Sequence, residues 1–259
     1  MSGQIQAELA KITTTRTWIV LLVVMLGYVL IGTAAQLWLD LLPRDSGGGG
    51  EIPGVPTIAN EQGVRNVWGT AGGGYVITLL LGILIVTTEY RHRTMTSTFL
   101  AQPHRLRVVG AKLVAATITS LGFAVVMCAA VAALALPVLA ARDAYALPAG
   151  DVAAILAGGL LSTTLFGVLG VGLGTLVRNQ VAAIVGGLVW LLLGEALLIS
   201  FLPSVGKWLP GGAASSLVQA TSFRGDALLS PGVAAVVLLG YSAVFVGIAA
   251  VTTLRRDVT

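Results

Sequence analysis

Long apolar stretches alternate with shorter polar connections along the whole chain. A helix rises about 1.5 Å per residue, so about 20 apolar residues cross the ~30 Å hydrocarbon core of a bilayer. Lipid offers no hydrogen-bond partners to a backbone, and a helix satisfies its own backbone groups. The pattern therefore predicts an all-α integral membrane protein, a single transmembrane domain over residues 1–259. The six predicted transmembrane helices are residues 17–39, 69–88, 113–136, 152–177, 181–202 and 232–254.

The segment before the first apolar stretch has a different pattern. Residues 1–16 are mostly polar, but Ile5, Leu9 and Ile12 recur at helical spacing. This spacing predicts a short amphipathic helix that lies on the inner surface of the membrane. A frayed N-terminal tail is the alternative interpretation.

The connection between the second and third stretches is basic. Residues 89–112 read EYRHRTMTSTFLAQPHRLRVVGAK. Thr94 or Thr96 can cap a short helix, and Pro103 would end it. One face of that helix would be formed by Met95, Phe99 and Leu100. We predict a short cytosolic helix here, the alternative being a solvated basic loop that only sets topology.

The remaining connections differ in length and composition. Residues 40–68 contain four consecutive glycines followed by Pro53 and Pro56, which is typical of a flexible tether rather than a phosphate-binding loop. Residues 178–180 alone join the fourth and fifth stretches and predict a tight antiparallel hairpin. Residues 203–231 are mildly apolar and favour short helices that enter the outer leaflet.

The composition agrees with a membrane location. The mean hydropathy is +0.92 and only 10% of residues are charged, whereas soluble domains contain about 25%. The single cysteine, Cys128, cannot form an internal disulfide. The net charge of +4 suggests basic loops rather than nucleic-acid binding, because inner loops of membrane proteins are enriched in Lys and Arg.

The distribution of charge predicts an orientation in which both termini are cytosolic. With the N-terminus inside, the inner basic residues are Lys11, Arg16, Arg91, Arg93, Arg105, Arg107, Lys112, Arg178, Arg255 and Arg256. The outer basic residues are Arg44, Arg65, Arg142, Lys207 and Arg224. Most acidic residues are then outside, namely Asp40, Asp45, Glu51, Glu61, Asp143, Asp151 and Asp226. Tryptophans near the predicted interfaces indicate an aromatic belt formed by Trp18, Trp38, Trp68 and Trp208.

Catalytic motifs are not evident. The sequence contains no G-x-x-x-x-G-K-S/T nucleotide-binding loop, so we expect no ATP hydrolysis by this chain. His92 and His104 lie in the basic connection without clustered metal ligands. Residues 162–164 are hydroxyl side chains within a span, without a histidine to activate them. We therefore expect no catalytic residues, no cofactor-binding residues and no metal site.

Two features inside the spans carry a hypothesis. Gly170 and Gly174, four residues apart, let another helix backbone approach closely. Glu195 is an ionisable residue within the fifth span, where a carboxylate is costly unless it faces a wet cavity or a partner. It is a candidate for a translocation path or an interface between two chains. A structural, hydrogen-bonded glutamate is the alternative.

Several segments together resemble the ABC-2-type permease family, the membrane subunits of ATP-binding cassette exporters. The matching residues are 89–95 (EYRHRTM), Leu100-x-x-Pro103-x-Arg105, 112–114 (KLV), 173–183 (LGTLVRNQVAA) and 208–213 (WLPGGA). The resemblance extends over nearly the whole chain. One departure is Arg93, where many relatives have glycine, which makes the connection more basic.

The resemblance implies a six-helix exporter subunit whose ATP and Mg²⁺ bind to a separate cytosolic ATPase, with two permease chains, identical or homologous, and two ATPases per transporter. Residues 1–16 would be the connecting helix, and residues 89–105 would contain the coupling helix that docks in the ATPase. The implied coupling residues are Glu89, Arg91, Arg93, Met95, Phe99, Leu100 and Arg105.

The family exports drugs, antibiotics, lipids, polysaccharides and ions. The few charges in the spans favour a hydrophobic or amphipathic substrate. The richness in Ala, Val and Gly resembles the usage of actinobacterial proteins, so we expect a bacterial cell membrane. Two other classes stay open: an ion-coupled secondary carrier, and a structural or regulatory membrane subunit that transports nothing.

Overall fold

The computed structural model describes residues 2–39, 57–92, 94, 105–220 and 228–255. All regular structure within them is helical. The helices that precede the third span are α1 (Ser2–Thr14), α2 (Thr17–Leu39), α3 (Glu61–Gly69), the short 3₁₀ turn η1 (Thr70–Gly72) and α4 (Tyr75–Arg91). The later elements are α6 (Arg105–Ala141), α7 (Ala149–Val177), α8 (Gln180–Val189), η2 (Trp190–Glu195), α9 (Ala196–Phe201), α10 (Pro203–Gly206), α11 (Pro210–Leu217) and α12 (Pro231–Arg255).

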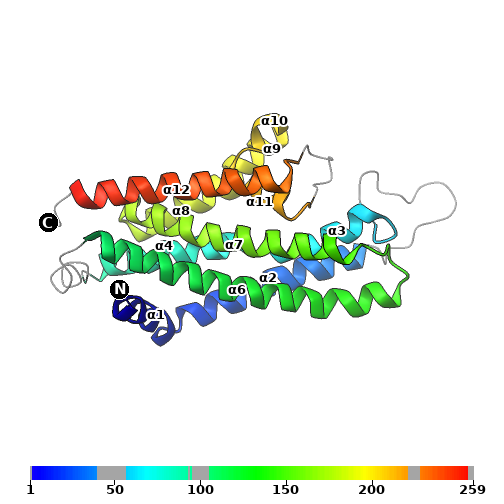
Figure 1. Ribbon diagram of the computed structural model, residues 1–259, viewed down its shortest axis with the longest axis horizontal. Helices are drawn as coiled ribbons and strands as arrows, with labels where there is room; N and C mark the ends of the chain where they lie inside the picture. The colour runs from blue at the N-terminus through cyan, green and yellow to red at the C-terminus, as the bar shows by residue number, and fades with distance from the viewer. Residues whose placement is uncertain (1, 40–56, 93, 95–104, 221–227, 256–259) are drawn as a thin grey trace.

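Six helical segments in the described part of the chain are long and apolar enough to cross a membrane. They are Thr17–Trp38, Glu61–Arg91, Leu106–Ala141, Ala149–Val177, Gln180–Phe201 and Pro231–Val251. The long helices run side by side along the long axis of the molecule (Figure 1). This confirms the prediction of an all-α protein with the architecture of a multi-pass membrane protein.

Each end of the bundle gathers a different set of elements (Figure 1). One end holds α1, the end of α4, the start of α6, the turn between α7 and α8, and the end of α12. At this end the guanidinium carbon of Arg178 lies 5.6 Å from the centre of the Tyr90 ring. The other end holds α3 and the turn between α6 and α7, while α10 and α11 lie short of that end, near the start of α12 (Figure 1). By the charge pattern, the first is the expected cytosolic end.

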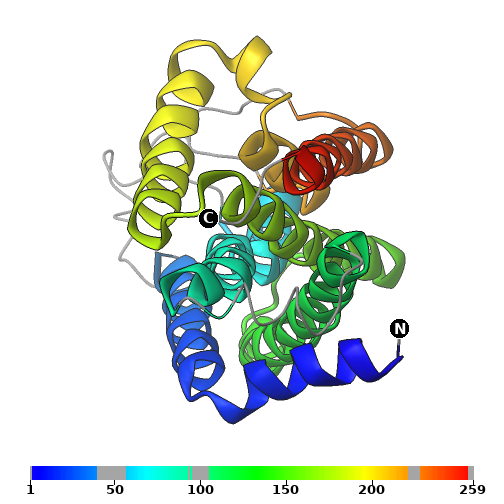
Figure 2. The same cartoon turned by 90° about the vertical axis from the view of Figure 1, so that its left-hand side faces the viewer.

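Helix α1 does not follow the bundle axis. Viewed along that axis, it lies across the end of the bundle, while α2 and α6 run away from the viewer (Figure 2). Ile5, Leu9 and Ile12 are partly buried on the side that faces the bundle. A helix is therefore present where the sequence predicts one, and its crosswise direction suits a helix that lies on a membrane surface.

Helices α4 and α7 are in backbone contact through glycines. A Cβ at Gly170 would clash with the carbonyl oxygen of Leu79, and one at Gly174 would lie 3.0 Å from the carbonyl oxygen of Ile83. On the α4 side, a Cβ at Gly82 would clash with the carbonyl oxygen of Gly167. The close approach expected at Gly170 and Gly174 is thus made against α4.

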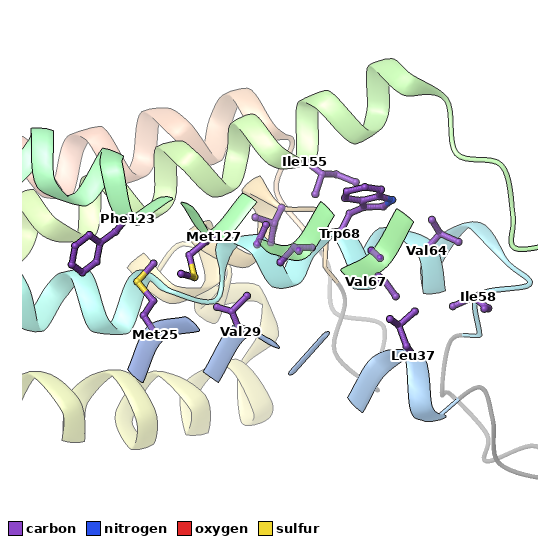
Figure 3. Close-up of a cluster of buried hydrophobic side chains, with 14 of the residues drawn as sticks. Met25, Val29, Leu37, Ile58, Val64, Val67, Trp68, Phe123, Met127 and Ile155 are labelled. Atoms are coloured by element: carbon purple, nitrogen blue, oxygen red, sulfur yellow. The ribbon is translucent and has the colours of Figure 1, made fainter. Parts of the chain in front are cut away.

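A cluster of buried apolar side chains packs α2, α3, α4, α6 and α7 against one another (Figure 3). Met25 from α2 and Met127 from α6 are fully buried there, and Ile155 from α7 lies beside Trp68 (Figure 3). Trp68 of α3 belongs to the same cluster and is only 4% exposed. The expectation that Trp68 contributes to an interfacial belt is therefore wrong, because its ring packs in the protein interior.

Two segments differ from the expected boundaries. Residues 61–68, expected as part of a tether, form α3 together with Gly69, and Asn60 accepts a hydrogen bond from the Gly63 N–H at 2.9 Å as the N-cap. Helix α6 begins eight residues before the expected third span and passes through Pro137 to Ala141. Its extra first turns contain the basic residues Arg105, Arg107 and Lys112, so the apolar pattern alone could not mark its start.

The hairpin between α7 and α8 matches the prediction. Arg178 ends α7 in the left-handed region, with φ 52°. Asn179 then caps α8 by accepting a hydrogen bond from the Ala182 N–H at 3.1 Å. A left-handed residue followed by a capping asparagine lets one helix end and the next begin within two residues.

Candidate functional site

Four charged side chains meet beneath α1 at the expected cytosolic end. Glu8 and Lys11 come from α1, Glu89 from the last turn of α4, and Lys112 from the second turn of α6. Lys112 is 1% exposed, and Glu8 and Glu89 are both buried. We call these four residues the ionic cluster.

Every carboxylate in the ionic cluster contacts both lysines. Lys112 Nζ lies 2.7 Å from Glu89 Oε1 and 2.8 Å from Glu8 Oε2. Lys11 Nζ lies 2.7 Å from Glu8 Oε1 and 2.7 Å from Glu89 Oε1. The cluster therefore joins three elements, α1, α4 and α6, through four ion pairs.

The ionic cluster has equal numbers of positive and negative charges, which offsets the cost of removing them from water. Burial lowers the pKa of Lys11, but hydrogen bonds and attraction from Glu8 and Glu89 outweigh it and raise that pKa above 10.5. Among the described residues, none donates a hydrogen bond to the buried Glu89 Oε2. This oxygen has the capacity to accept one more donor.

An open groove of about 510 Å³ runs beside the ionic cluster. Its polar lining includes Glu8, Lys11 and His92, and its apolar lining includes Trp18 and Leu84. The groove thus lies between α1, the start of α2 and the end of α4. It adds a second accessible surface at the same end of the bundle.

The structure describes three of the residues that the family resemblance implies for coupling, and their coupling role stays a prediction. Glu89 is 7% exposed and belongs to the ionic cluster rather than to a solvated rim. Arg91 is exposed at the end of α4, with one guanidinium nitrogen 3.4 Å from Gln180 Oε1. Arg105 is the first residue of α6. Four further positions lie outside the described residues: Arg93, Met95, Phe99 and Leu100.

Three members of the ionic cluster were not predicted from the sequence to lie together. They are Glu8, Lys11 and Lys112. A signal did exist for Glu8, which lies at helical spacing between Ile5 and Ile12 and so faces the same side as the apolar residues. Lys112 similarly precedes an uninterrupted apolar stretch in its helix. Charged residues on an otherwise apolar face indicate a buried partner of opposite charge.

The second candidate site surrounds Glu195, which is 1% exposed. Glu195 ends η2, a π-helical turn in which residues five apart lie one above the other. Trp190, five residues earlier, donates its indole N–H to Glu195 Oε1 at 3.1 Å. The π turn therefore creates a pairing that a regular α-helix would place on different sides.

The other carboxylate oxygen of Glu195 caps a helix. The Gly211 N–H, in the first turn of α11, donates to Glu195 Oε2 at 2.6 Å. Helix N-termini have unpaired N–H groups and partial positive charge, which a carboxylate stabilises. A Cβ at Gly211 would lie 2.5 Å from that oxygen, so a larger residue here would require the Glu195 carboxylate to shift. Sequence analysis missed this partner because it is a backbone group.

An apolar groove of about 360 Å³ opens beside Glu195, between α4, α7, α8 and α12. Glu195 is the only carboxylate among its lining residues, and the groove includes the rings of Phe166, Trp190, Tyr241 and Phe245. We call it the aromatic groove. Glu195 thus accepts hydrogen bonds from Trp190 and Gly211 and also borders a groove that is formed by a single chain.

The structure thus presents two candidate sites, the ionic cluster with its neighbouring groove and the aromatic groove beside Glu195. No group of three or more possible metal ligands occurs among the described residues. No protein-family model matches the chain, and no curated protein matches it.

Proposed function

We propose that this chain is the permease subunit of an ATP-binding cassette exporter of the ABC-2 type. In this proposal it forms the path for a hydrophobic or amphipathic substrate, and a separate cytosolic ATPase drives transport. Support comes from the six spans, from the motif resemblance, and from the order in which those motifs follow the spans.

The ionic cluster is the observation that carries the proposal. Glu89, the first residue of the family-like motif, is fixed by Lys112 at 2.7 Å and by Lys11 at 2.7 Å. The connection that follows Glu89 thus leaves from a position held by α1 and α6. A force applied to that connection by an ATPase would reach three elements at once, which a solvated loop could not achieve.

The substrate path and the arrangement of two permease chains are parts of the same proposal. Exposed apolar side chains cover the outward face of α8 and η2, including Val181, Val185 and Leu193. Such a surface suits either lipid or a second permease chain. Both termini are proposed to be cytosolic, in accord with the distribution of basic residues.

The decisive experiment measures ATP hydrolysis by a reconstituted complex. The chain is purified with an ATPase of the ATP-binding cassette class, encoded beside it, and hydrolysis is measured in lipid nanodiscs. Phe99→Asp should abolish substrate-stimulated hydrolysis while leaving the chain in the membrane, because it places a charge on the expected docking face.

Tyr145→Asp is the matched control, an exposed aromatic residue changed to acid at the opposite end of the bundle. It should leave hydrolysis unchanged. An ATPase that neither binds the chain nor responds to it would reject the proposal. Transport without any ATPase would then favour a secondary carrier, and the absence of both would favour a structural or regulatory subunit.

A further inference from the structure

The aromatic groove combines an apolar lining with one acidic side chain. Leucines and aromatic rings form its sides, and Glu195 is the only carboxylate among the described residues that line it. In the described part of the chain, no lysine, arginine or histidine forms an ion pair with Glu195. The two N–H donors, from Trp190 and Gly211, occupy one site on each oxygen. A carboxylate has about four acceptor positions, so acceptor capacity remains.

A negative group in an apolar setting without a counter-ion favours the binding of a cation. The face of an aromatic ring also attracts cations, and Trp190 is half exposed at the side of the aromatic groove. The cavity, about 360 Å³, falls in the lower part of the range that is typical of small-molecule sites. A small cation with an apolar body fits all three properties.

Two glycines keep the aromatic groove open. Gly186 and Gly187 line it, and a Cβ built at Gly186 meets no atom within 4 Å. A larger side chain at Gly186 would therefore enter free space instead of displacing the backbone. A bulky side chain can therefore be added to the lining of the aromatic groove at Gly186 without substituting Glu195 or its two donors.

We infer that the aromatic groove binds a lipophilic monocation, such as a quaternary ammonium or phosphonium compound, with its charge beside Glu195 and its apolar body against Phe166, Tyr241 and Phe245. The site is complete within a single chain. The inference deepens the proposed permease function, and it rests on that function only where the ligand is taken to be transported.

The test is equilibrium binding of radiolabelled tetraphenylphosphonium to the purified chain in nanodiscs, without ATPase or nucleotide. We expect saturable binding that the neutral analogue triphenylphosphine oxide does not displace. Glu195→Gln should weaken binding at least about tenfold, since the shape is kept and the charge is lost. Gly186→Leu should abolish binding by filling the aromatic groove.

Gly122→Leu is the matched control, because a Cβ at Gly122 also meets no atom within 4 Å but this residue lies on α6, away from the aromatic groove. It should bind like the parent. If Glu195→Gln disturbs folding, Gly186→Leu decides alone, since it leaves the carboxylate in place. Absence of saturable binding, or equal binding by the parent and Gly186→Leu, would overturn the inference. Failure of ATPase coupling would not affect this result, so the two proposals fail separately.

Discussion

Lys112 Nζ lies 2.7 Å from Glu89 Oε1, although the two residues are separated by the whole basic connection between the second and third spans. This ion pair brings the two ends of the connection together. Helix α1 adds two further contacts, because Glu8 pairs with Lys112 and Lys11 pairs with Glu89. The beginning and the end of the segment implied to dock on an ATPase are therefore held at a fixed separation.

Removal of Lys112 should strongly destabilise the fold. Lys112→Met leaves two buried carboxylates facing only one lysine, and breaking a buried ion pair costs about 3–5 kcal/mol. Lys11→Met should cost about 1 kcal/mol or less, because the Lys11 side chain is 49% exposed. Thermal and denaturant unfolding in detergent would measure both. Equal losses from the two variants would contradict this ranking.

Removing one charge of each sign should restore part of the loss. In the double variant Lys112→Met with Glu8→Gln, the pair between Lys11 and Glu89 at 2.7 Å remains, and the charges again balance. We expect the double variant to be more stable than Lys112→Met alone. A double-mutant cycle measures this coupling, and strictly additive losses would show that the cluster does not act as a unit.

Alkaline pH should weaken the docking of α1. The pKa of Lys11 is higher in the folded protein than its ordinary value of 10.5, so the stabilisation by Lys11 is complete below pH 10.5 and is lost as pH rises through the folded pKa. Unfolding of the parent and of Lys11→Met is compared from pH 8 to about pH 12. The difference between them should shrink above pH 10.5, and a constant difference would exclude this role of the charge.

Glycine contacts between α4 and α7 should be intolerant of a single methyl group. Gly170→Ala places a Cβ against the Leu79 carbonyl oxygen and should cost about 1–3 kcal/mol. Gly27→Ala is the matched control, because its Cβ meets no atom within 4 Å and alanine favours helix. The measurement is the unfolding midpoint of each variant. A harmless Gly170→Ala would mean that the helices can separate easily.

The orientation in the membrane can be tested with single cysteines after Cys128→Ser. Ala59→Cys and His92→Cys lie in exposed positions near opposite ends of the bundle. A membrane-impermeant maleimide should label the first from outside intact cells and the second only after permeabilisation. The reverse pattern would invert the orientation and remove the connection after Glu89 from the side where ATPases act.

The sequence was informative where a pattern repeats along one helix. The apolar stretches predicted the membrane helices, and Arg178 and Asn179 correctly indicated a tight turn. Helix α3 was missed because its pattern is amphipathic and follows a glycine-rich segment. The partners of Lys112 and Glu195 could not be predicted, because helix adjacency is set by packing in three dimensions. In the case of Glu195, one partner is a backbone N–H, which no side-chain pattern can reveal.

The glycine contacts between α4 and α7 also have a mechanical consequence. At Gly82, Gly170 and Gly174 backbone meets backbone, and no long side chain lies there that could change rotamer and let one helix slide past the other. Helices α4 and α7 should therefore move as one rigid unit that extends from the ionic cluster toward the opposite end of the bundle. A motion that begins at Glu89 would then be transmitted along the whole length of α4 and α7. Conformational changes would instead occur in the other helices, which pack against α4 and α7 through larger side chains.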